Sequence, residues 1–569
     1  MTKKPWVKLY QGFPEDIQIP DATLYETLAD SAARWPEHNA MLYMGRQISF
    51  AELIREVDTC AAAFASYGIK VHDSVVLSLP NMPGAIICFY ALNKIGARAV
   101  MTHPLSSPVE LKHYISISDA HWAVTVDMFY PVFRELARET GLKRLVITRF
   151  SDYLSRPKKI GFAVTKGRKI AGVPGDDPLV IRWKDFLATG AATGAVQPYV
   201  RPIEPDDGSV ILFSGGTTNM PKGIELSSAN FNALAVSMSA ISGLNAGDSV
   251  LAILPVFHGF GLGLCIHTTM SVGGYFILVP EFSAEIYINN LIKHNPSFIA
   301  GVPTLFQALM GHSKFAKVSF DRLKGAYSGG DMLSADLKRR FDEAIMSQNS
   351  RVELMEGYGL TECVTACAVS PRNAYRDNSM GIPMPGMLVK VVDSATGEEL
   401  PYGKEGEFCV SGPTLMKGYV KDPEATAQAL REHADGLKWV HTGDLGVMDA
   451  DGFVYFRQRI KRLIITSGYN VYPSQLENIL EANKYVHISC VIGVKDPYKI
   501  QKVKAFIVLK PGYSPSDGIK EELFAYCRKN IAKYAIPYDI EFRDDLPKTL
   551  VGKVAYRKLE EEEMNKVTA

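Results

Sequence analysis

The sequence predicts a multidomain α/β protein, and three observations lead to this fold class. The chain has 569 residues, whereas a single hydrophobic core rarely grows beyond about 250–300 residues. Helical and strand patterns alternate up to about residue 345, which is typical of layered α/β units with parallel sheets. After about residue 390 the pattern changes to short strands and turns. We therefore expect a large N-terminal domain, made of two layered α/β subdomains and a β-rich subdomain, followed by a small α+β C-terminal domain.

The first α/β unit has clear element boundaries. Ser49 and Glu52 have the spacing of a capping box, and apolar residues follow at helical spacing until Gly68. A short buried strand is expected over Val75–Leu79, and the next helix is expected to end near Lys94. This succession of helix, strand and helix indicates a parallel sheet covered by helices.

The same alternation recurs over residues 205–345, where an apolar strand at Phe298–Val302 precedes a helical segment. Further along, three short strands are expected at Leu388–Val392, Gly406–Val410 and Gly452–Phe456. Their brevity and the turns between them predict the β-rich subdomain.

We expect the domain division to fall between residues 1–458 and 459–569. The C-terminal part carries 19 basic and 14 acidic residues, a net charge of +5, while the whole chain is only +1. The N-terminal part is therefore −4. A nearly neutral total conceals a basic C-terminal domain that is suited to approach phosphate groups.

Composition excludes several classes of protein. The chain is 47% hydrophobic and 22% charged, as expected of a globular protein. Its balanced charge gives no indication of nucleic acid binding. Eight scattered cysteines form no CxxC pair, and Cys363 and Cys367 lack further ligands nearby for a zinc site. No apolar run follows Lys3 and Lys4, so we expect no signal peptide and a cytoplasmic location.

Residues 249–280 contain no Asp, Glu, Lys or Arg and are long enough to cross a bilayer. Pro255, His258, His267 and several glycines interrupt this run, however. We therefore expect buried strands and a helix joined by a functional loop.

Residues 153–173 contain six basic side chains with no acidic residue between them, and apolar residues are interleaved. The simpler interpretation is a solvated connection. The alternative is a patch that contacts anionic lipid, which would place the protein peripherally at the inner face of the membrane.

Residues 210–223 carry the strongest chemical pattern. An apolar strand leads into a loop rich in glycine and hydroxyl side chains, and Lys222 closes the loop. Backbone amides of such a loop can converge on an anion, and the hydroxyls and lysine add donors, which predicts a phosphate site. Gly223 follows the lysine, so the GK[ST] ending of the nucleoside triphosphatase loop is absent. A polar hairpin between two strands is the structural alternative.

This segment resembles the signature loop of the adenylate-forming superfamily, which comprises acyl-CoA synthetases, luciferases and peptide-synthetase adenylation domains. The usual pattern is [ST]SGTTGxPKG. Gly215 replaces the usual serine, as in fatty-acyl-CoA ligases, and Asn219 replaces the usual glycine. Asparagine tolerates the left-handed backbone conformation better than other non-glycine residues.

The resemblance continues in order along the chain. Leu254–His258 is similar to the motif whose histidine lines the acyl pocket, and Leu262 stands where some relatives have a tryptophan gate. Ala326–Asp331 resembles the adenine-binding turn. Glu356–Glu362 is close to the YGxTE motif.

Within that last motif, the resemblance assigns Tyr358 to adenine stacking, Thr361 to a phosphate contact and Glu362 to Mg²⁺. Asp444, in a TGD motif, would hold the ribose hydroxyls. Ser214 is the second predicted metal-site residue.

Three C-terminal motifs complete the series. Arg457–Arg462 resembles the DRxKD hinge, in which Arg459 would contact nucleotide and Lys461 would mark the hinge. Gln458 and Arg462 depart from that pattern. Ser467–Pro473 is similar to the loop that enters the site during the thiol step, and Pro547–Lys553 resembles the closing PKTxxGK motif.

The predicted catalytic residues are His258, Thr217, Glu362 and Lys553. The predicted nucleotide-binding residues are Ser214, Gly215, Gly216, Thr217, Thr218, Lys222, Gly329, Gly330, Glu356, Gly357, Tyr358, Thr361, Asp444, Arg459, Lys461 and Gly468.

The resemblance implies a two-step ligase that uses ATP, Mg²⁺ and coenzyme A. A carboxylate would attack ATP to give acyl-AMP and pyrophosphate, and CoA would then displace AMP after the mobile C-terminal domain rotates. The Pro5–Trp6 region, Gly215 and the basic insertion are most like bacterial long-chain fatty-acyl-CoA ligases. Medium-chain or aryl acids, an acyl-AMP ligase that serves a carrier protein, and an inactive relative are the alternatives. A homodimer is left open.

Overall fold

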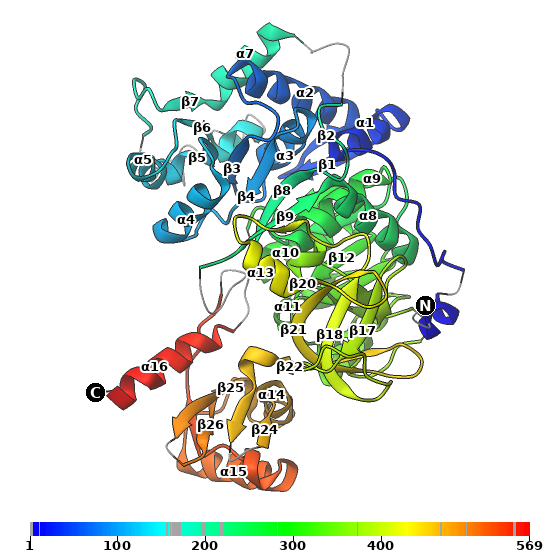
Figure 1. Cartoon of the computed structure of the whole chain (residues 1–569), viewed down its shortest axis with the longest axis vertical. Helices are drawn as coiled ribbons and strands as arrows, with labels where there is room; N and C mark the ends of the chain where they lie inside the picture. Colours follow the sequence, from blue (N-terminus) through cyan, green and yellow to red (C-terminus); the bar gives the residue numbers. More distant parts are fainter. Residues whose placement is uncertain are drawn as a thin grey trace.

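The computed structural model arranges the chain as a large N-terminal region with a smaller C-terminal unit beside it (Figure 1). Its coordinates describe residues 4–10, 12–154, 158–159, 161, 172–194, 201–214, 220–281, 283–372, 374–466, 469–496, 498–549 and 554–568. Four sheets organise these residues.

An eight-stranded sheet has the order β19-β9-β8-β4-β3-β5-β6-β7. Its strands are β3 (Ser74–Ser78), β4 (Arg98–Met101), β5 (Trp122–Val126), β6 (Arg144–Thr148), β7 (Val180–Arg182), β8 (Gly208–Phe213), β9 (Gly223–Ser227) and β19 (Gly418–Tyr419). The strands from β8 to β7 pair in parallel, whereas β9 and β19 are antiparallel additions at one edge.

Helices cover both faces of this sheet. Alternate residues along its strands therefore pack into two different hydrophobic cores. Val76 and Val100 pack with α4 (Pro108–Ser118) and α5 (Tyr130–Glu139). Neighbours of these valines on the other face join the main core with α2 (Phe50–Ser66), α3 (Pro83–Lys94) and α7 (Trp183–Thr193). Two-sided burial explains the continuous apolar strands that the sequence shows.

A nine-stranded sheet has the order β16-β15-β14-β13-β12-β10-β11-β1-β2. Its strands are β1 (Asn39–Tyr43), β2 (Arg46–Ser49), β10 (Ser249–Ala252), β11 (Tyr275–Leu278), β12 (Phe298–Gly301), β13 (Gly325–Gly329), β14 (Leu354–Tyr358), β15 (Ala368–Val369) and β16 (Ile382–Pro383). The strands from β14 to β1 run parallel. The carboxyl ends of β13 and β14 therefore meet at one edge, and the segments that follow them carry the adenine-turn and YGxTE motifs.

The helices associated with this sheet are α1 (Leu24–Arg34), α8 (Ser228–Ser242), α9 (Thr268–Ser271), α10 (Ala284–His294), α11 (Pro303–Met310) and α12 (Ala335–Ser347). One hydrophobic cluster joins α1, α3 and α8 to strands of both large sheets. The two large sheets therefore share a core.

The β-rich subdomain has the strand order β17-β18-β21-β20, and β22 pairs with β21. Its elements are β17 (Leu388–Val392), β18 (Glu405–Ser411), α13 (Pro423–Ala429), β20 (Leu430–Glu432), β21 (Lys438–Met448) and β22 (Val454–Arg459). All of its strand pairs are antiparallel. This agrees with the short strands predicted after residue 390.

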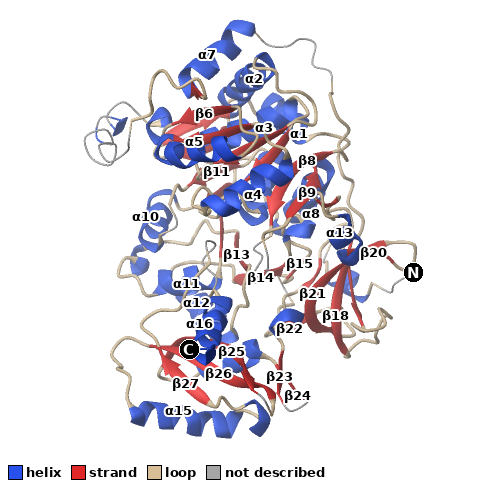
Figure 2. Ribbon diagram, turned by 60° about the vertical axis from the view of Figure 1, so that its left-hand side comes forward, coloured by secondary structure: helices blue, strands red, loops and turns tan. Residues whose placement is uncertain are grey.

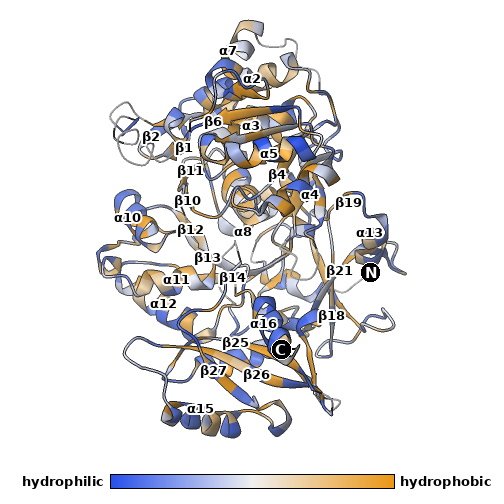
Figure 3. Ribbon diagram, turned by 90° about the vertical axis from the view of Figure 1, so that its left-hand side faces the viewer, coloured by the Kyte–Doolittle hydropathy of each residue, from blue (hydrophilic) through white to orange (hydrophobic). Residues whose placement is uncertain are grey.

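The C-terminal unit is an α+β layer structure. Its elements are β23 (Ile464–Thr466), β24 (Tyr469–Val471), α14 (Pro473–Glu481), β25 (Val486–Asp496), β26 (Ile500–Leu509), α15 (Asp517–Asn530), β27 (Asp539–Phe542) and α16 (Tyr556–Thr568). The helices α15 and α16 lie on opposite sides of the sheet (Figure 2). The second half of β26 is apolar, whereas α16 is largely polar (Figure 3). Each face of this sheet therefore buries its own cluster.

Short helical turns complete the secondary structure. They are η1 (Pro5–Leu9), η2 (Asp127–Phe129), η3 (Phe150–Tyr153), η5 (Phe260–His267), η6 (Phe315–Lys317), η7 (Thr361–Cys363), η8 (Ile460–Arg462) and η9 (Lys533–Ala535). The predicted multidomain α/β fold class is confirmed.

The uncharged run 249–280 forms β10, the π-helix η5, α9 and β11, as expected of buried strands and a helix. Among the described residues, no helix is long and apolar enough to cross a membrane. Most of the basic segment 153–173 lies outside the described residues. Of its lysines, Lys158 donates a hydrogen bond to the Met44 carbonyl. Its contact with lipid stays a prediction.

The close packing of α7 on α2 depends on Gly190. A Cβ atom at this position would lie 2.0 Å from the Thr59 carbonyl oxygen and 2.9 Å from the Ala63 nitrogen. We expect Gly190→Ala to separate the two helices and to lower the free energy of unfolding by about 1–3 kcal/mol, measured by urea denaturation. Gly311→Ala is the control, because its Cβ would sit at an ordinary 3.8 Å. Equal effects of the two variants would contradict the packing argument.

Candidate active site

The two ends of the predicted phosphate loop are tied together. The Ser214 N–H donates to the Lys222 carbonyl over 3.0 Å, and the Lys222 N–H donates to Ser214 Oγ over 3.1 Å. These bonds close the turn between β8 and β9. Gly215, Gly216, Thr217, Thr218 and Asn219 lie outside the described residues, so their roles stay predictions.

Tyr419 connects the predicted phosphate lysine to the predicted metal carboxylate. Lys222 Nζ lies 4.4 Å from the centroid of the Tyr419 ring. The Tyr419 hydroxyl donates to Glu362 Oε1 over 2.8 Å. Burial and the charge of Glu362 raise the pKa of this phenol, so it remains a neutral donor. Tyr419 was not among the predicted site residues.

Glu362 sits in a constrained turn. The next residue but one, Val364, has φ +63°, a left-handed conformation that a β-branched residue adopts only under strain. A Cβ on Gly359 would lie 1.4 Å from the Thr365 carbonyl oxygen, and a Cβ on Gly259 would lie 1.7 Å from the Val364 carbonyl oxygen. Only glycine fits either position. The turn therefore packs directly on the loop that contains His258.

His258, the predicted acyl-pocket residue, accepts a hydrogen bond at Nδ1 from the Phe260 N–H over 3.1 Å. Its carbonyl accepts from the Leu262 N–H over 2.9 Å, at the start of η5. These local hydrogen bonds hold the His258 imidazole at the N-terminal end of η5. Thr361 begins η7, in the turn that packs on this loop at Gly259.

The predicted adenine end of the site lies where β13 and β14 finish. Gly329 pairs with Gly357 across these strands, and Gly330 follows at φ +82°, which favours glycine. The buried Glu356 accepts at Oε1 from the Leu333 N–H over 2.9 Å. Burial raises the pKa of Glu356 to about 8, so its carboxyl is largely protonated at neutral pH.

Asp444 is the centre of a second cluster. Its side chain is 1% exposed. Tyr358 Oη donates to Asp444 Oδ2 over 2.7 Å, and Arg459 Nε lies 2.9 Å from Asp444 Oδ1. The charge of Asp444 raises the pKa of Arg459, with smaller contributions from Tyr358 and Glu362. Arg459 thus supplies the counter-charge of the buried Asp444 carboxylate.

The two departures from the hinge pattern both bond to α14. Gln458 Oε1 accepts from the N–H of Ser474 over 3.1 Å and from its hydroxyl over 2.8 Å. Arg462 forms a partly buried ion pair with Glu477. Lys461 lies between them in η8 and is exposed. Gly468 and Lys553 lie outside the described residues.

Two family models match this chain. The model described as AMP-binding enzyme matches residues 28–420, and the model described as AMP-binding enzyme C-terminal domain matches residues 475–553. The first alone covers more than half of the chain.

The chain belongs to the AMP-binding enzyme family.

Full-length relatives agree with this assignment. A "Long-chain-fatty-acid--CoA ligase" of Bacillus subtilis is 32% identical over 99% of this chain and 98% of the relative. A "Crotonobetaine/carnitine--CoA ligase" of Proteus mirabilis is 30% identical over 90% of this chain and 93% of the relative. The crystal structure of ATP-bound MatB from Rhodopseudomonas palustris matches with a TM-score of 0.80 and 25% identity, over 95% of this chain and 99% of that one.

The predicted membership of the adenylate-forming superfamily is thereby confirmed. The AMP-binding enzyme described here is an adenylate-forming acid–CoA ligase, a type of enzyme that uses ATP and CoA.

The donor set of this AMP-binding enzyme fits Mg²⁺. Glu362 offers carboxylate oxygens and Ser214 offers a hydroxyl, and hard oxygen donors are those that Mg²⁺ prefers. Neither residue is a soft ligand that would select another metal.

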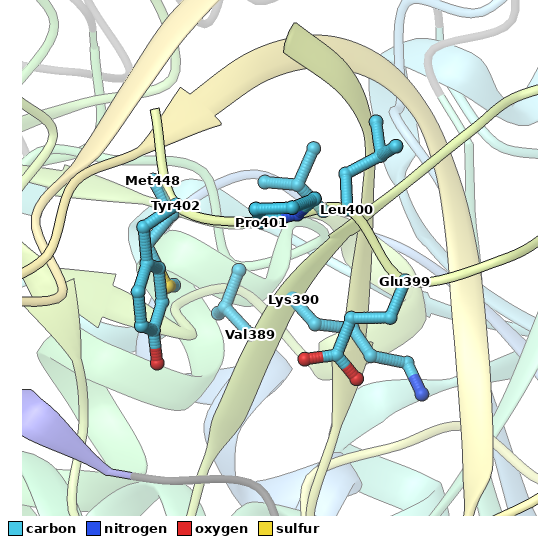
Figure 4. A pocket seen from close by; sticks show the side chains of 8 residues that line it. Val389, Lys390, Glu399, Leu400, Pro401, Tyr402 and Met448 are labelled. Atoms are coloured by element: carbon cyan, nitrogen blue, oxygen red, sulfur yellow. The ribbon is translucent and has the colours of Figure 1, made fainter. Parts of the chain in front are cut away.

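A small cavity lies elsewhere, in the β-rich subdomain. Its volume is about 10 Å³, and Val389, Lys390 and Tyr402 are among the residues that line it (Figure 4). A space of this size holds no more than about one water molecule. It is therefore too small for an acyl chain or a nucleotide.

The raised pKa of Glu356 predicts a pH-dependent stability. Between about pH 4.5 and 8 the unfolded carboxyl is ionised while the buried one stays protonated. The folded state then binds the extra proton, so stability falls as pH rises, by up to about 1.4 kcal/mol per pH unit. Glu356→Gln keeps an acceptor for Leu333 and should flatten this decline, measured by urea denaturation from pH 5 to 8.

Glu398→Gln is the matched control, because Glu398 is exposed in the β-rich subdomain. It should leave the pH profile as in the parent protein. A Glu356→Gln profile as steep as that of the parent would show that Glu356 is ionised in the folded state.

Proposed function

We propose that this protein is an ATP-dependent long-chain fatty-acid–CoA ligase. The observation that carries the proposal is a pair of polar clusters: Lys222, Tyr419 and Glu362 form one, and Tyr358, Asp444 and Arg459 form the other. Together they combine cations and hydrogen-bond donors for phosphate with a buried carboxylate suited to ribose hydroxyls.

In the first half-reaction, an oxygen of the fatty-acid carboxylate attacks the α-phosphorus of ATP, and the bond to the pyrophosphate oxygen breaks. Lys222, Ser214, Thr217 and Thr218 bind the phosphates and stabilise charge on their oxygens. Glu362 and Ser214 would hold Mg²⁺, which when bound neutralises part of the phosphate charge. Lys553 stabilises the leaving pyrophosphate.

The nucleoside is bound by groups on three strands. Gly329 and Gly330 allow adenine to approach the backbone, with Glu356 and Gly357 beside them, and Tyr358 stacks on the ring. Asp444 accepts hydrogen bonds from the ribose hydroxyls. Tyr358 Oη also donates to Asp444 Oδ2, so the ribose hydroxyls would share this carboxylate with Tyr358.

In the second half-reaction, the CoA thiolate attacks the acyl carbon and AMP leaves. The proposed domain boundary lies between residues 458 and 459, at the end of β22. Lys461 follows immediately, and rotation about it would replace Lys553 in the site by the loop that contains Gly468. The bonds from Ser474 to Gln458 cross this boundary and must adjust during such a rotation.

The long-chain preference is supported by the 32% identity with the Bacillus subtilis ligase and by the uncharged run 249–280, which fits a wall for an apolar tail. The 30% identity with a crotonobetaine/carnitine ligase makes a short polar acid the competing substrate class, next to medium-chain and aryl acids.

A panel of acids decides among these substrates. Pyrophosphate release is measured with ATP, Mg²⁺ and fatty acids of graded length, benzoate or carnitine, each with and without CoA. We expect the highest kcat/KM for long chains and CoA-dependent formation of acyl-CoA. An aryl or carnitine preference would overturn the long-chain proposal. AMP release with a carrier protein but no acyl-CoA would identify an acyl-AMP ligase, and no pyrophosphate with any acid would identify an inactive relative.

Lys553→Ala should separate the two half-reactions. Adenylation should fall by about 10²–10³-fold, as for loss of one preorganised charge-stabilising group, while thiolysis of supplied acyl-AMP should change far less. Rapid-quench measurement of each half-reaction tests this. Lys548→Ala is the control from the same segment, because Lys548 is paired with Asp545 at 3.1 Å. Equal loss in both half-reactions would remove Lys553 from the adenylation step.

A further inference from the structure

The β-rich subdomain contains a cluster of soft ligands outside the nucleotide site. Cys409 on β18 and His441 on β21 are directly paired across the two strands, so their side chains project from the same face. His433 follows the end of β20, the next strand in the sheet. Three neighbouring strands thus direct one thiol and two imidazoles to one place.

The ligand atoms of these three residues converge. His433 Nε2 and His441 Nε2 are 3.0 Å apart, and one ring nitrogen of each histidine and Cys409 Sγ all lie within 4.8 Å of one another. Tetrahedral zinc with bonds of about 2.0–2.3 Å separates its ligand atoms by about 3.3–3.7 Å. Only a small adjustment would therefore bring the three atoms to one ion.

Glu407 orients one of these ligands. Glu407 Oε2 lies 2.9 Å from His441 Nδ1, so the carboxylate accepts the Nδ1 proton and leaves a lone pair on Nε2. A carboxylate behind a histidine ligand is the usual outer partner in zinc sites, where it fixes the tautomer and raises the basicity of the imidazole.

The cluster has one buried side and one accessible side. Cys409 is fully buried, the His441 side chain is 5% exposed, and His433 is partly exposed. Water and ions therefore approach past His433. Three protein ligands with one open direction make a site in which water occupies the fourth position.

Charged side chains from the neighbouring strands lie near the cluster. Lys390 on β17 forms an ion pair with Asp435 at 3.0 Å. The positive charge of Arg431 on β20 favours the ionised forms of Glu407 and Cys409. The thiol of Cys409 must lose its proton to bind a metal.

We propose that Cys409, His433 and His441 form a zinc-binding site, oriented by Glu407 and completed by water. Binding forms one bond from the metal to sulfur and two bonds to imidazole nitrogens, and it releases the Cys409 proton to solvent. A thiolate with two imidazoles selects a borderline-soft ion such as Zn²⁺ over Mg²⁺. The site is separate from the predicted magnesium residues Ser214 and Glu362.

The site is connected to the nucleotide site by one carboxylate. Glu407 Oε1 accepts a hydrogen bond from the Gly443 N–H over 2.9 Å, while its other oxygen holds His441. Gly443 directly precedes Asp444. Metal binding at the cluster therefore acts on the turn that carries the predicted ribose ligand.

The test uses the full-length protein after chelator treatment, without nucleotide. Zn²⁺ binding is measured by calorimetry, and Co²⁺ is titrated while thiolate-to-cobalt charge-transfer absorption is followed. We expect one Zn²⁺ per chain and a thiolate band with Co²⁺. Cys409→Ser should abolish the band, and His433→Asn should weaken Zn²⁺ binding more than tenfold. Glu407→Gln should weaken it by about 10–100-fold, the usual effect of losing an outer carboxylate.

Cys527→Ser and His72→Asn are the controls, since these residues are a buried cysteine and an exposed histidine outside the cluster. Both should bind Zn²⁺ as the parent does. Circular dichroism checks that each variant is folded, and the partly exposed His433 is the variant least expected to disturb folding. The absence of stoichiometric binding would overturn the proposal, as would binding that His433→Asn and Cys409→Ser leave unchanged. Binding at Glu362 instead would show no thiolate band.

Discussion

The buried carboxylate of Asp444 is the interaction on which the arrangement of the site depends. A carboxylate that is 1% exposed needs a compensating charge and hydrogen bonds, and Tyr358 and Arg459 supply them. Tyr358 ends the strand β14 of the nine-stranded sheet, Asp444 belongs to the β-rich subdomain, and Arg459 ends β22 where the C-terminal unit begins. One desolvated charge thus joins three parts of the chain.

The sequence was sufficient for the fold class and for the strand β8 that leads into the predicted phosphate loop, because these follow from local patterns. Apolar runs bounded by glycine or proline predicted the strands β3 and β12 to within one residue at each end. They also predicted the end of α3 at Lys94. The bonds between Ser214 and Lys222 agree with the predicted turn.

What could not be predicted depends on contacts between distant segments. Tyr419 lies 57 residues after Glu362 in a segment with no distinctive pattern. The protonated state of Glu356 arises from its burial, which no spacing of residues reveals. Cys409, His433 and His441 become neighbours only through the strand order β18-β21-β20, so cysteine spacing gave no indication of them. The departures Gln458 and Arg462 were visible in the sequence, but their partners on α14 were not.

Glu407 shares its two oxygens between the imidazole of His441 and the backbone of Gly443. Any ligand that changes the electron demand on one oxygen changes the acceptor strength of the other. Thermodynamic linkage makes such an influence reciprocal: to the extent that occupancy of the histidine cluster alters nucleotide affinity, nucleotide must alter the affinity of the cluster by the same factor. Glu407 would in this way couple the nucleotide affinity of the enzyme to the concentration of Zn²⁺ around it.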